Sequence, residues 1–487
     1  MVAQVELGMS RSTEAWAWEQ FGRVRTGDAR RLKRLVKLAR QAADAPDGRI
    51  ASVCSDRRDR EGAYDLLESG RVEASDLLRG VAAATARQCQ GENLVYVAVD
   101  GSSLTVRGRR RGEAFGAIGS YEQGVSGVKV MSALAVSSTG TTVGLLDQTW
   151  WTRPQRRRLR DCRRRPLRDK ESRRWLEVIE RSRRAMDDQA PETTACFLLD
   201  REGDNQAVLS YAVANQVRLI VRAQHNRRLV GHDGRRRRWR SEGAPLLLNT
   251  VKQRRAAGCH RVLVPAKDER PERVAQLEVR FMRVRLLLQD TRSSNVREPV
   301  ELDVVDAKEK HPPPGTAPLA WTLLTTQQVR TLHEARAVIN AYCYRWQIEQ
   351  FHRTWKNGAC CVERSQLRSV HALTAWATIL AAVATRIERI KHLSREHPES
   401  SARDEFSADE LEALLIMHHH RRPHEALPKT DQMTMGQAAH LLADLGGYVQ
   451  SSAKRPPGSV VLARGLLRLQ HYVEALGAIA VYRRGAN

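Results

Sequence analysis

The spacing of apolar and polar positions divides the chain into three regions, and the first is helical. Up to about residue 75 apolar residues recur at helical intervals, with Leu32, Leu35 and Leu38 forming one stripe. Asp28 stands directly before this stripe, where a side chain caps the free amides of a first helical turn. The pattern predicts a small helical domain over residues 1–75.

The middle region, residues 76–395, alternates apolar runs with helical segments, which is typical of an α/β domain. NLVYVAVD and ACFLLD are predicted to be buried strands that end at Asp100 and Asp200. VRLIVRA and LAWTLLTT are two further predicted strands, and VMSALAVSSTGTTVGLLDQTWW is a predicted hairpin. The region therefore predicts a sheet flanked by helices.

Two features complete the middle region. Between about residues 228 and 316, short β patterns such as HRVLVP and VELDVV are separated by loops rich in Pro, Arg and Gly. We interpret this stretch as a β insertion within the α/β domain. A single long helix is then predicted from about Leu332 through Lys356.

The third region, residues 396–487, is again predicted to be helical. Its last helix has a wide apolar face from Val460 to Ala478, which either pairs with a second copy of the chain or packs on its own domain. The apolar run Leu373–Ala384 is shorter than the ~18–20 residues that cross a bilayer. We interpret that run as a buried core helix and expect no membrane partner.

Charge narrows the class of partner. The 487 residues include 81 Lys and Arg against 56 Asp and Glu, a net charge of +25. With an ordinary hydrophobic content of 41%, this excess favours nucleic acid first, an anionic membrane surface second and simply solvated arginines third. The arginine-rich segment 153–184 is either a phosphate-binding surface or a solvated loop. Eight cysteines without a CxxC pair, and no signal peptide, predict a cytoplasmic protein.

Acidic residues carry the candidate chemistry. Asp100 and Asp200 each follow an apolar strand, at the sheet edge where sites form in open α/β folds. Taken alone, an Asp in such a position is more often a cap or turn residue. A third acid, Glu349, lies in the predicted long helix. Three carboxylates from separate elements suit a pair of divalent metal ions acting on phosphodiesters, because hard cations prefer oxygen ligands.

The helix that carries Glu349 has a distinctive pattern. Tyr342, Arg345, Glu349 and Lys356 follow one another at steps of three, four and seven residues, which places them on one face of a continuous helix. The basic residues of this face would hold phosphates, Arg345 through its planar guanidinium.

At these residues the chain resembles the DDE transposases of the bacterial insertion-sequence-four group, the kind typified by the transposon-five transposase. Their signature Y-x2-R-x3-E-x6-K is reproduced within AYCYRWQIEQFHRTWKNG, and the resemblance extends to VGLLDQTWWTRP, LLDREGDNQAVL, LIVRAQHNRR and GDARRLKRLV. It implies a ribonuclease-H-like catalytic core, between an N-terminal helical DNA-binding domain and a C-terminal helical domain. It also implies two Mg²⁺ per active site, with Mn²⁺ as a substitute, on a triad of Asp100, Asp200 and Glu349.

The resemblance further implies three groups of DNA contacts. They are a basic residue beside the active site, Arg222; two tryptophans placed for a flipped base, Trp321 and Trp346; and an N-terminal helix that touches DNA through Arg30, Arg31 and Arg34. Stacking on an aromatic ring would offset ~1–3 kcal/mol of lost base stacking. A core position is the alternative for either tryptophan, and for Trp346 it is the favoured one.

The expected function is cut-and-paste DNA transposition. Two protomers would hold two element ends as a homodimer, and each active site would nick double-stranded DNA, form and resolve a hairpin, and transfer the strand into target DNA. A catalytically decayed copy that binds DNA and inhibits transposition is the alternative. A ribonuclease-H-like nuclease without strand transfer is a third possibility. The complete triad favours the first.

Overall fold

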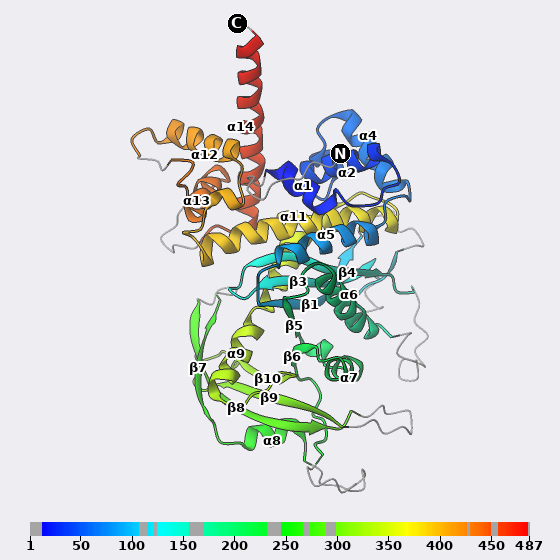
Figure 1. The fold of residues 1–487 in the computed structure, drawn as a ribbon, viewed down its shortest axis with the longest axis vertical. Helices are drawn as coiled ribbons and strands as arrows, with labels where there is room; N and C mark the ends of the chain where they lie inside the picture. The colour runs from blue at the N-terminus through cyan, green and yellow to red at the C-terminus, as the bar shows by residue number, and fades with distance from the viewer. Residues whose placement is uncertain are drawn as a thin grey trace.

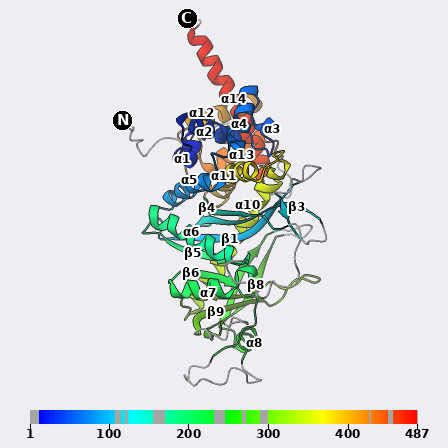
Figure 2. The same ribbon diagram turned by 90° about the vertical axis from the view of Figure 1, so that its right-hand side faces the viewer.

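Both ends of the chain lie at the helical end of the molecule, and one large sheet fills the other end (Figures 1 and 2). The computed structural model describes residues 12–106, 115–119, 124–154, 170–230, 245–265, 272–288, 299–425, 429–449 and 456–485. Two long helices, α11 and α5, separate the helical end from the sheet (Figure 1). Of the arginine-rich segment predicted at 153–184, residues 155–169 lie outside the described residues.

The sheet is mixed and, in the described part of the chain, ten-stranded. Its order is β2-β3-β1-β5-β6-β10-β9-β8-β7, and β4 pairs with β3 beside this path. The strands are β1 (Leu94–Thr105), β2 (Gly116–Ala117), β3 (Ser126–Ser137), β4 (Thr142–Trp151), β5 (Thr194–Leu199), β6 (Arg218–Arg222), β7 (Gly258–Val264), β8 (Arg273–Leu286), β9 (Val300–Glu309) and β10 (Ala320–Thr325). Only β1, β5 and β6 run parallel to one another, which explains the continuous apolar runs of β5 and β6. The predicted α/β class is confirmed.

The predicted β insertion contributes to this same sheet. β9 pairs antiparallel with β10, β8 with β9 and β7 with β8, so the strands between β6 and β10 extend the central sheet outwards. The short helix α8 (Leu247–Gln253) packs beside them. Where the insertion begins and ends as a unit, predicted at about 228–316, stays a prediction.

Helices cover both faces of the sheet. One face carries α9 (Leu332–Cys343), α10 (Trp346–Lys356) and α11 (Val370–Glu396), and the other carries α6 (Arg173–Gln189), α7 (Gln206–Ala214) and α8. The helical end contains α1 (Thr13–Phe21), α2 (Ala29–Asp44), α3 (Ile50–Val53), α4 (Arg57–Glu68), α12 (Ala408–Arg421), α13 (Met435–Leu445) and α14 (Ser459–Gly485). Helix α5 (Ala74–Gln88) lies between the two ends. The described residues also include the 3₁₀ turns η3 (Arg201–Gly203), η4 (Val362–Arg364) and η5 (Ala402–Asp404).

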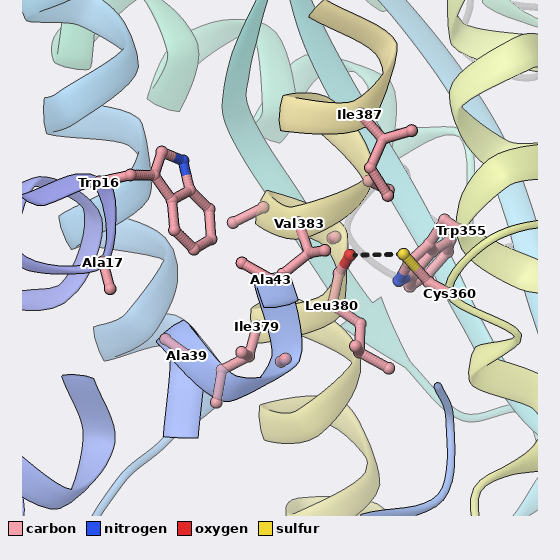
Figure 3. Packing of buried hydrophobic residues seen from close by; sticks show 14 of the residues in the cluster. Trp16, Ala17, Ala39, Ala43, Trp355, Cys360, Ile379, Leu380, Val383 and Ile387 are labelled. Atoms are coloured by element: carbon pink, nitrogen blue, oxygen red, sulfur yellow. Dashed lines mark hydrogen bonds between the residues drawn. The ribbon is translucent and has the colours of Figure 1, made fainter. Parts of the chain in front are cut away.

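Helix α11 is the centre of the core. Figure 3 shows its Ile379 and Val383 between Trp16 and Ala39 of the N-terminal helices on one side and Trp355 of α10 on the other. The same hydrophobic cluster also contains apolar residues of α12, α13 and α14. The three regions predicted along the chain therefore share one core, and how the chain divides into domains at 75 and 395 stays a prediction.

The apolar run predicted to be a core helix lies within α11. By length and composition α11 could cross a membrane, but 89% of its most apolar 18-residue window is buried inside the protein. The prediction of a buried core helix is confirmed.

The prediction of one continuous helix from Leu332 through Lys356 is wrong. The chain makes a tight turn at Tyr344 and Arg345, between α9 and α10. The amide of Arg345 donates to the carbonyl of Tyr342 (3.1 Å) and that of Gln347 to the carbonyl of Tyr344 (3.0 Å), a spacing of three residues that winds the backbone more tightly than an α-helix. The two helices are thus packed and oriented separately.

Candidate active site

Asp100 and Asp200 lie side by side on neighbouring parallel strands. The parallel pairing of β1 with β5 ends at Val99 and Leu199, and the two aspartates are the next residues. Asp100 follows Ala98 by two positions, so it points to the face of the sheet that α10 covers. The adjacency that the sequence predicted at a sheet edge is therefore present.

The strand that carries Asp100 is longer than predicted. β1 continues to Thr105 because Gly101–Thr105 stay paired with β3 after β5 has ended. The prediction that this strand ends at Asp100 is wrong, although Asp100 does mark the end of its parallel pairing. Asp200 does follow its strand directly, and its Oδ1 caps η3 by accepting from the amides of Glu202 (2.8 Å) and Gly203 (3.4 Å).

Electrostatics links all three predicted acids. The pKa of Asp100 is raised to about 7, mainly by burial and next by the Asp200 carboxylate, with Glu349 adding to the rise while the Arg345 guanidinium and the amide of Gly101 oppose it. Burial and like charges both disfavour ionisation, so the raised pKa reflects a partly desolvated carboxylate with acidic neighbours. Such clusters are typical of functional sites.

The first turn of α10 supplies the third acid and its basic partner. The Arg345 guanidinium hydrogen-bonds Oε1 of Glu349, four residues along the helix, and lies 5.8 Å from the ring centre of Tyr342. Tyr342 in turn meets Trp321 of β10 edge to face, with ring centres 5.4 Å apart. Arg345, in the turn between the two helices, thus contacts both Tyr342 of α9 and Glu349 of α10.

Arg222, the last residue of β6, lies near Tyr342 on the side of the sheet. Its Nη2 donates to the carbonyl of Ala320 (2.9 Å). Burial lowers the pKa of its guanidinium, and the nearby Tyr342 and Asp200 oppose this lowering. Arg222, Tyr342 and Arg345 therefore place basic and aromatic groups near Asp200.

Lys356 is the last residue of α10. Its Nζ is 3.8 Å from Oε1 of Glu363, the same oxygen that accepts from the amide of Thr105 (3.0 Å). The structure therefore places Lys356 beside the last residue of β1.

Trp346, at the start of α10, is 37% exposed, so the interpretation of this residue as a core aromatic is wrong.

A second basic surface lies at the helical end of the molecule. Four cations of α2 line a groove of about 260 Å³ between α2 and α4: Arg30, Lys33, Arg34 and Lys37. Asp28 caps this helix as predicted, accepting from the amide of Arg30 (2.8 Å). Lys37 is paired with Asp59 of α4 (2.6 Å), and Arg31 donates to the carbonyl of Thr26 (3.3 Å) instead of lining the groove.

Comparison with known families now decides the class. Residues 13–72 match the family described as transposase DNA-binding, and residues 96–386 match the family described as transposase DDE domain. The second match spans more than half of the chain. The chain belongs to the DDE transposase family.

The match settles the coarser expectations. The transposase has the expected ribonuclease-H-like core, and the family match covers the sheet strands β4, β3, β1, β5 and β6. It is an enzyme of DNA transposition that has DNA as a partner, and its basic α2 groove lies within the DNA-binding match. Individual site residues, including Arg30, Arg31, Arg34 and Trp321, stay predictions.

Transposase DDE domains generally use divalent metal ions, and the donor set of this transposase suits one. Two aspartates and a glutamate offer hard oxygen ligands, and a cation would relieve the repulsion that raises the pKa of Asp100. As the side chains of the described residues lie, no three of them enclose a metal ion, since Glu349 is bonded to Arg345 and Asp200 to backbone amides.

His352 lies beside the predicted site residue Asp100, and the sequence did not single it out. Its Nδ1 lies 3.9 Å from Oδ2 of Asp100, and its Nε2 lies 3.4 Å from Oγ of Ser132, the residue paired with Asp100 across β1 and β3. Burial, together with Lys356, lowers the pKa of this imidazole to about 3, so it is neutral at pH 7. Its position one turn after Glu349 was the available signal.

Proposed function

We propose that this protein is a cut-and-paste transposase of the insertion-sequence-four group, of the transposon-five kind. It binds the terminal inverted repeats of its element, excises the element through nicking and hairpin formation and resolution, and joins the 3′ ends to target DNA. The observation that carries the proposal is the placement of Asp100 and Asp200 where the adjacent parallel strands β1 and β5 stop pairing, with Asp200, Glu349 and Arg345 all acting electrostatically on Asp100.

The three carboxylates would hold two Mg²⁺, for which Mn²⁺ would substitute. When bound, such ions activate the attacking oxygen and stabilise the leaving oxygen of a phosphodiester. Arg345 is placed to hold a phosphate beside them, because its planar fork already spans Glu349 and the Tyr342 ring. Lys356, next to Thr105 and Glu363, would hold the DNA strand further along β1.

The aromatic residues support a flipped base during hairpin formation. Trp321 packs on Tyr342 next to Arg222, and Trp346 stands exposed at the start of α10. An exposed indole beside a phosphate-binding arginine can stack on a nucleotide that leaves the helix. We assign this role first to Trp346, because its ring is available to a ligand.

Pairing of two protomers is supported by α14. Its first half is buried through residues such as Leu462 and Leu469, but its far end is exposed, with Val481 64% and Tyr482 77% accessible. In Figure 1 this end extends beyond the other helices. We propose that it pairs with a second copy when two DNA ends are brought together, and that the complex acts in the cytoplasm on nucleoid DNA.

The deciding experiment is a cleavage assay on DNA that carries the inverted repeats flanking the gene. With Mg²⁺ or Mn²⁺ the protein should give nicks, then hairpins, then a released element end that joins a target plasmid. A catalytically decayed inhibitor would bind the repeats and cut nothing. A nuclease without strand transfer would cut and leave the target plasmid unjoined. The hairpin and the joined product therefore separate all three functions.

A further inference from the structure

A buried charge cluster lies behind α10. Glu388 of α11 is fully buried, and its Oε2 hydrogen-bonds the Lys391 ammonium while Nε2 of His392 stands 3.8 Å away. A carboxylate without water costs much free energy unless it is paired and hydrogen-bonded on all sides. The groups that complete its shell are therefore held firmly in place.

Two hydroxyl groups from different helices converge on the other oxygen of Glu388. Oγ1 of Thr354 in α10 donates to Oε1 at 2.5 Å, and Oγ of Ser459, the first residue of α14, donates to the same atom at 2.6 Å. Hydrogen bonds to an ionised acceptor are stronger than neutral ones. One oxygen atom thus connects the start of α14 with α10.

Two further residues of α10 anchor the same side of this helix. Oε1 of Gln350 accepts from Nζ of Lys391 (2.8 Å), and Oε1 of Gln347 accepts from Oγ1 of Thr142 (3.0 Å). The Thr142 oxygen also lies 2.9 Å from Nδ1 of His392, which brings it into the cluster. Together with the Thr354 bond, these contacts make one polar face of α10.

The opposite face of α10 points to the acidic site. Glu349, His352 and Lys356 repeat the spacing of three and four residues found on the anchored face, shifted by two positions. At roughly 100° per residue, two positions turn about 200° around the helix. The face of α10 that carries Glu349 and the face that hydrogen-bonds Glu388 therefore lie on opposite sides of the same helix. A displacement of α10 at one face moves the residues of the other face as well.

Helix α10 depends on this anchor for its placement. It has 11 residues, and the tight turn at Tyr344 and Arg345 separates it from α9. A short helix that is not continuous with its predecessor takes its position from its side-chain contacts. The Glu388 cluster supplies polar contacts on one side of the helix, and the apolar Phe351 and Trp355 pack into the core.

We propose that Glu388 is a positioning residue that couples the seating of α14 to the placement of Glu349. The path runs from Ser459 of α14 through Oε1 of Glu388 to Thr354, and so to the catalytic face of α10. A partner that binds the exposed end of α14 therefore binds a helix whose first residue, Ser459, hydrogen-bonds Glu388. The inference rests on the proposed catalytic role of Glu349, and its first test is independent of that role.

The first test measures hydrogen–deuterium exchange of the α10 backbone, residues 346–356, in the full chain. Ser459→Ala, which changes only the α14 end of the path, should speed exchange in α10 about threefold or more. The control is Thr378→Val, which removes a buried hydroxyl of α11 that donates within its own helix, to the Thr374 carbonyl (2.9 Å). Exchange in α10 that is unchanged by Ser459→Ala, or changed equally by Thr378→Val, would overturn the coupling.

The second test measures single-turnover nicking at saturating end DNA. Ser459→Ala and Thr354→Val should each slow nicking about tenfold with DNA affinity unchanged, and Thr354→Ser should restore the rate. Because both act through Glu388, the double variant should be no slower than the slower single variant. Rates that multiply, or that follow the loss of melting temperature, would show a merely structural role. A wild-type chain that cuts nothing would refute the proposed function, and the exchange test would still decide the coupling.

Discussion

Nδ1 of His352 lies 3.9 Å from the Asp100 carboxylate and belongs to the helix that carries Glu349. The imidazole therefore touches one predicted metal ligand and is one helical turn from another. Its other nitrogen faces Ser132 on β3, so the imidazole lies between Asp100 of β1 and Ser132 of β3.

We expect His352→Ala to lower the nicking rate roughly 10- to 100-fold, as is usual when a group that orients a metal ligand is removed. Binding of end DNA should stay within about twofold, because the buried ring is not placed to contact DNA. A gel-shift series and a nicking assay on one preparation measure both. His420→Ala, at an exposed histidine of α12, is the control. Equal loss of binding and nicking in His352→Ala would remove it from the site.

The triad assignment predicts variants that bind DNA ends but do not cut them. Asp100→Asn, Asp200→Asn and Glu349→Gln should each abolish cutting while end binding persists, because these carboxylates would hold metal and not phosphate. Glu202→Gln removes an exposed acid of η3 two residues from Asp200 and should cut normally. Any triad variant that cuts at nearly the wild-type rate would exclude that residue as a ligand.

The α2 groove predicts a change in salt dependence. Arg30→Ala combined with Arg34→Ala should weaken end binding, because fewer phosphates are neutralised. The slope of log affinity against log salt should fall by about 0.9 for each phosphate that the double variant no longer binds. Arg57→Ala, on α4 and paired with Glu61, is the control that should leave the slope unchanged. If affinity and slope are both unaffected by the double change, DNA ends are recognised elsewhere.

The exposed end of α14 predicts a defect confined to paired ends. A double change of Val481→Glu and Ile479→Glu should leave binding of one DNA end intact and remove complexes that contain two. Truncation from about Leu442 is unsuitable, since it also removes the buried residues Leu462 and Leu469 and would expose the core. Arg483→Ala is the control on the same exposed segment. Native mass with and without end DNA gives the answer, and persistent paired complexes would contradict a role of α14 in pairing.

Stability should depend on pH through Asp44. Burial raises the pKa of Asp44 from 3.8 to about 7, with Arg386 and Arg40 opposing the rise and Glu410 adding to it. The folded state therefore holds this proton more tightly than the unfolded state. The stabilisation that protonated Asp44 gives the folded state is fully present below pH 3.8 and is lost as pH rises to about 7. Asp44→Asn should raise the urea midpoint at about pH 8 and change it little near pH 4. An equal gain at both values would mean that Asp44 does not titrate in this range.

Much of the local structure was predictable because its causes are local. The cap at Asp28, the apolar runs of β5 and β6, and the buried character of Leu373–Ala384 depend on neighbouring residues, and they were predicted correctly. The spacing of the Tyr-Arg-Glu-Lys signature and the net charge of +25 also belong to the amino-acid sequence. Together they indicated a DNA transposase, and the match to the DDE family confirms that class.

Features that depend on distant partners could be seen only in the folded chain. β1 continues to Thr105 because β3 stays paired with it, although nothing in the residues after Asp100 requires a strand. The break between α9 and α10 lets each helix pack separately, which no apolar period could show. His352 and Glu388 gain their importance only because Asp100 and Ser459, far away in the chain, meet them in the fold. The residues alone thus indicate which chemical groups act, whereas long-range packing sets how those groups are held in place.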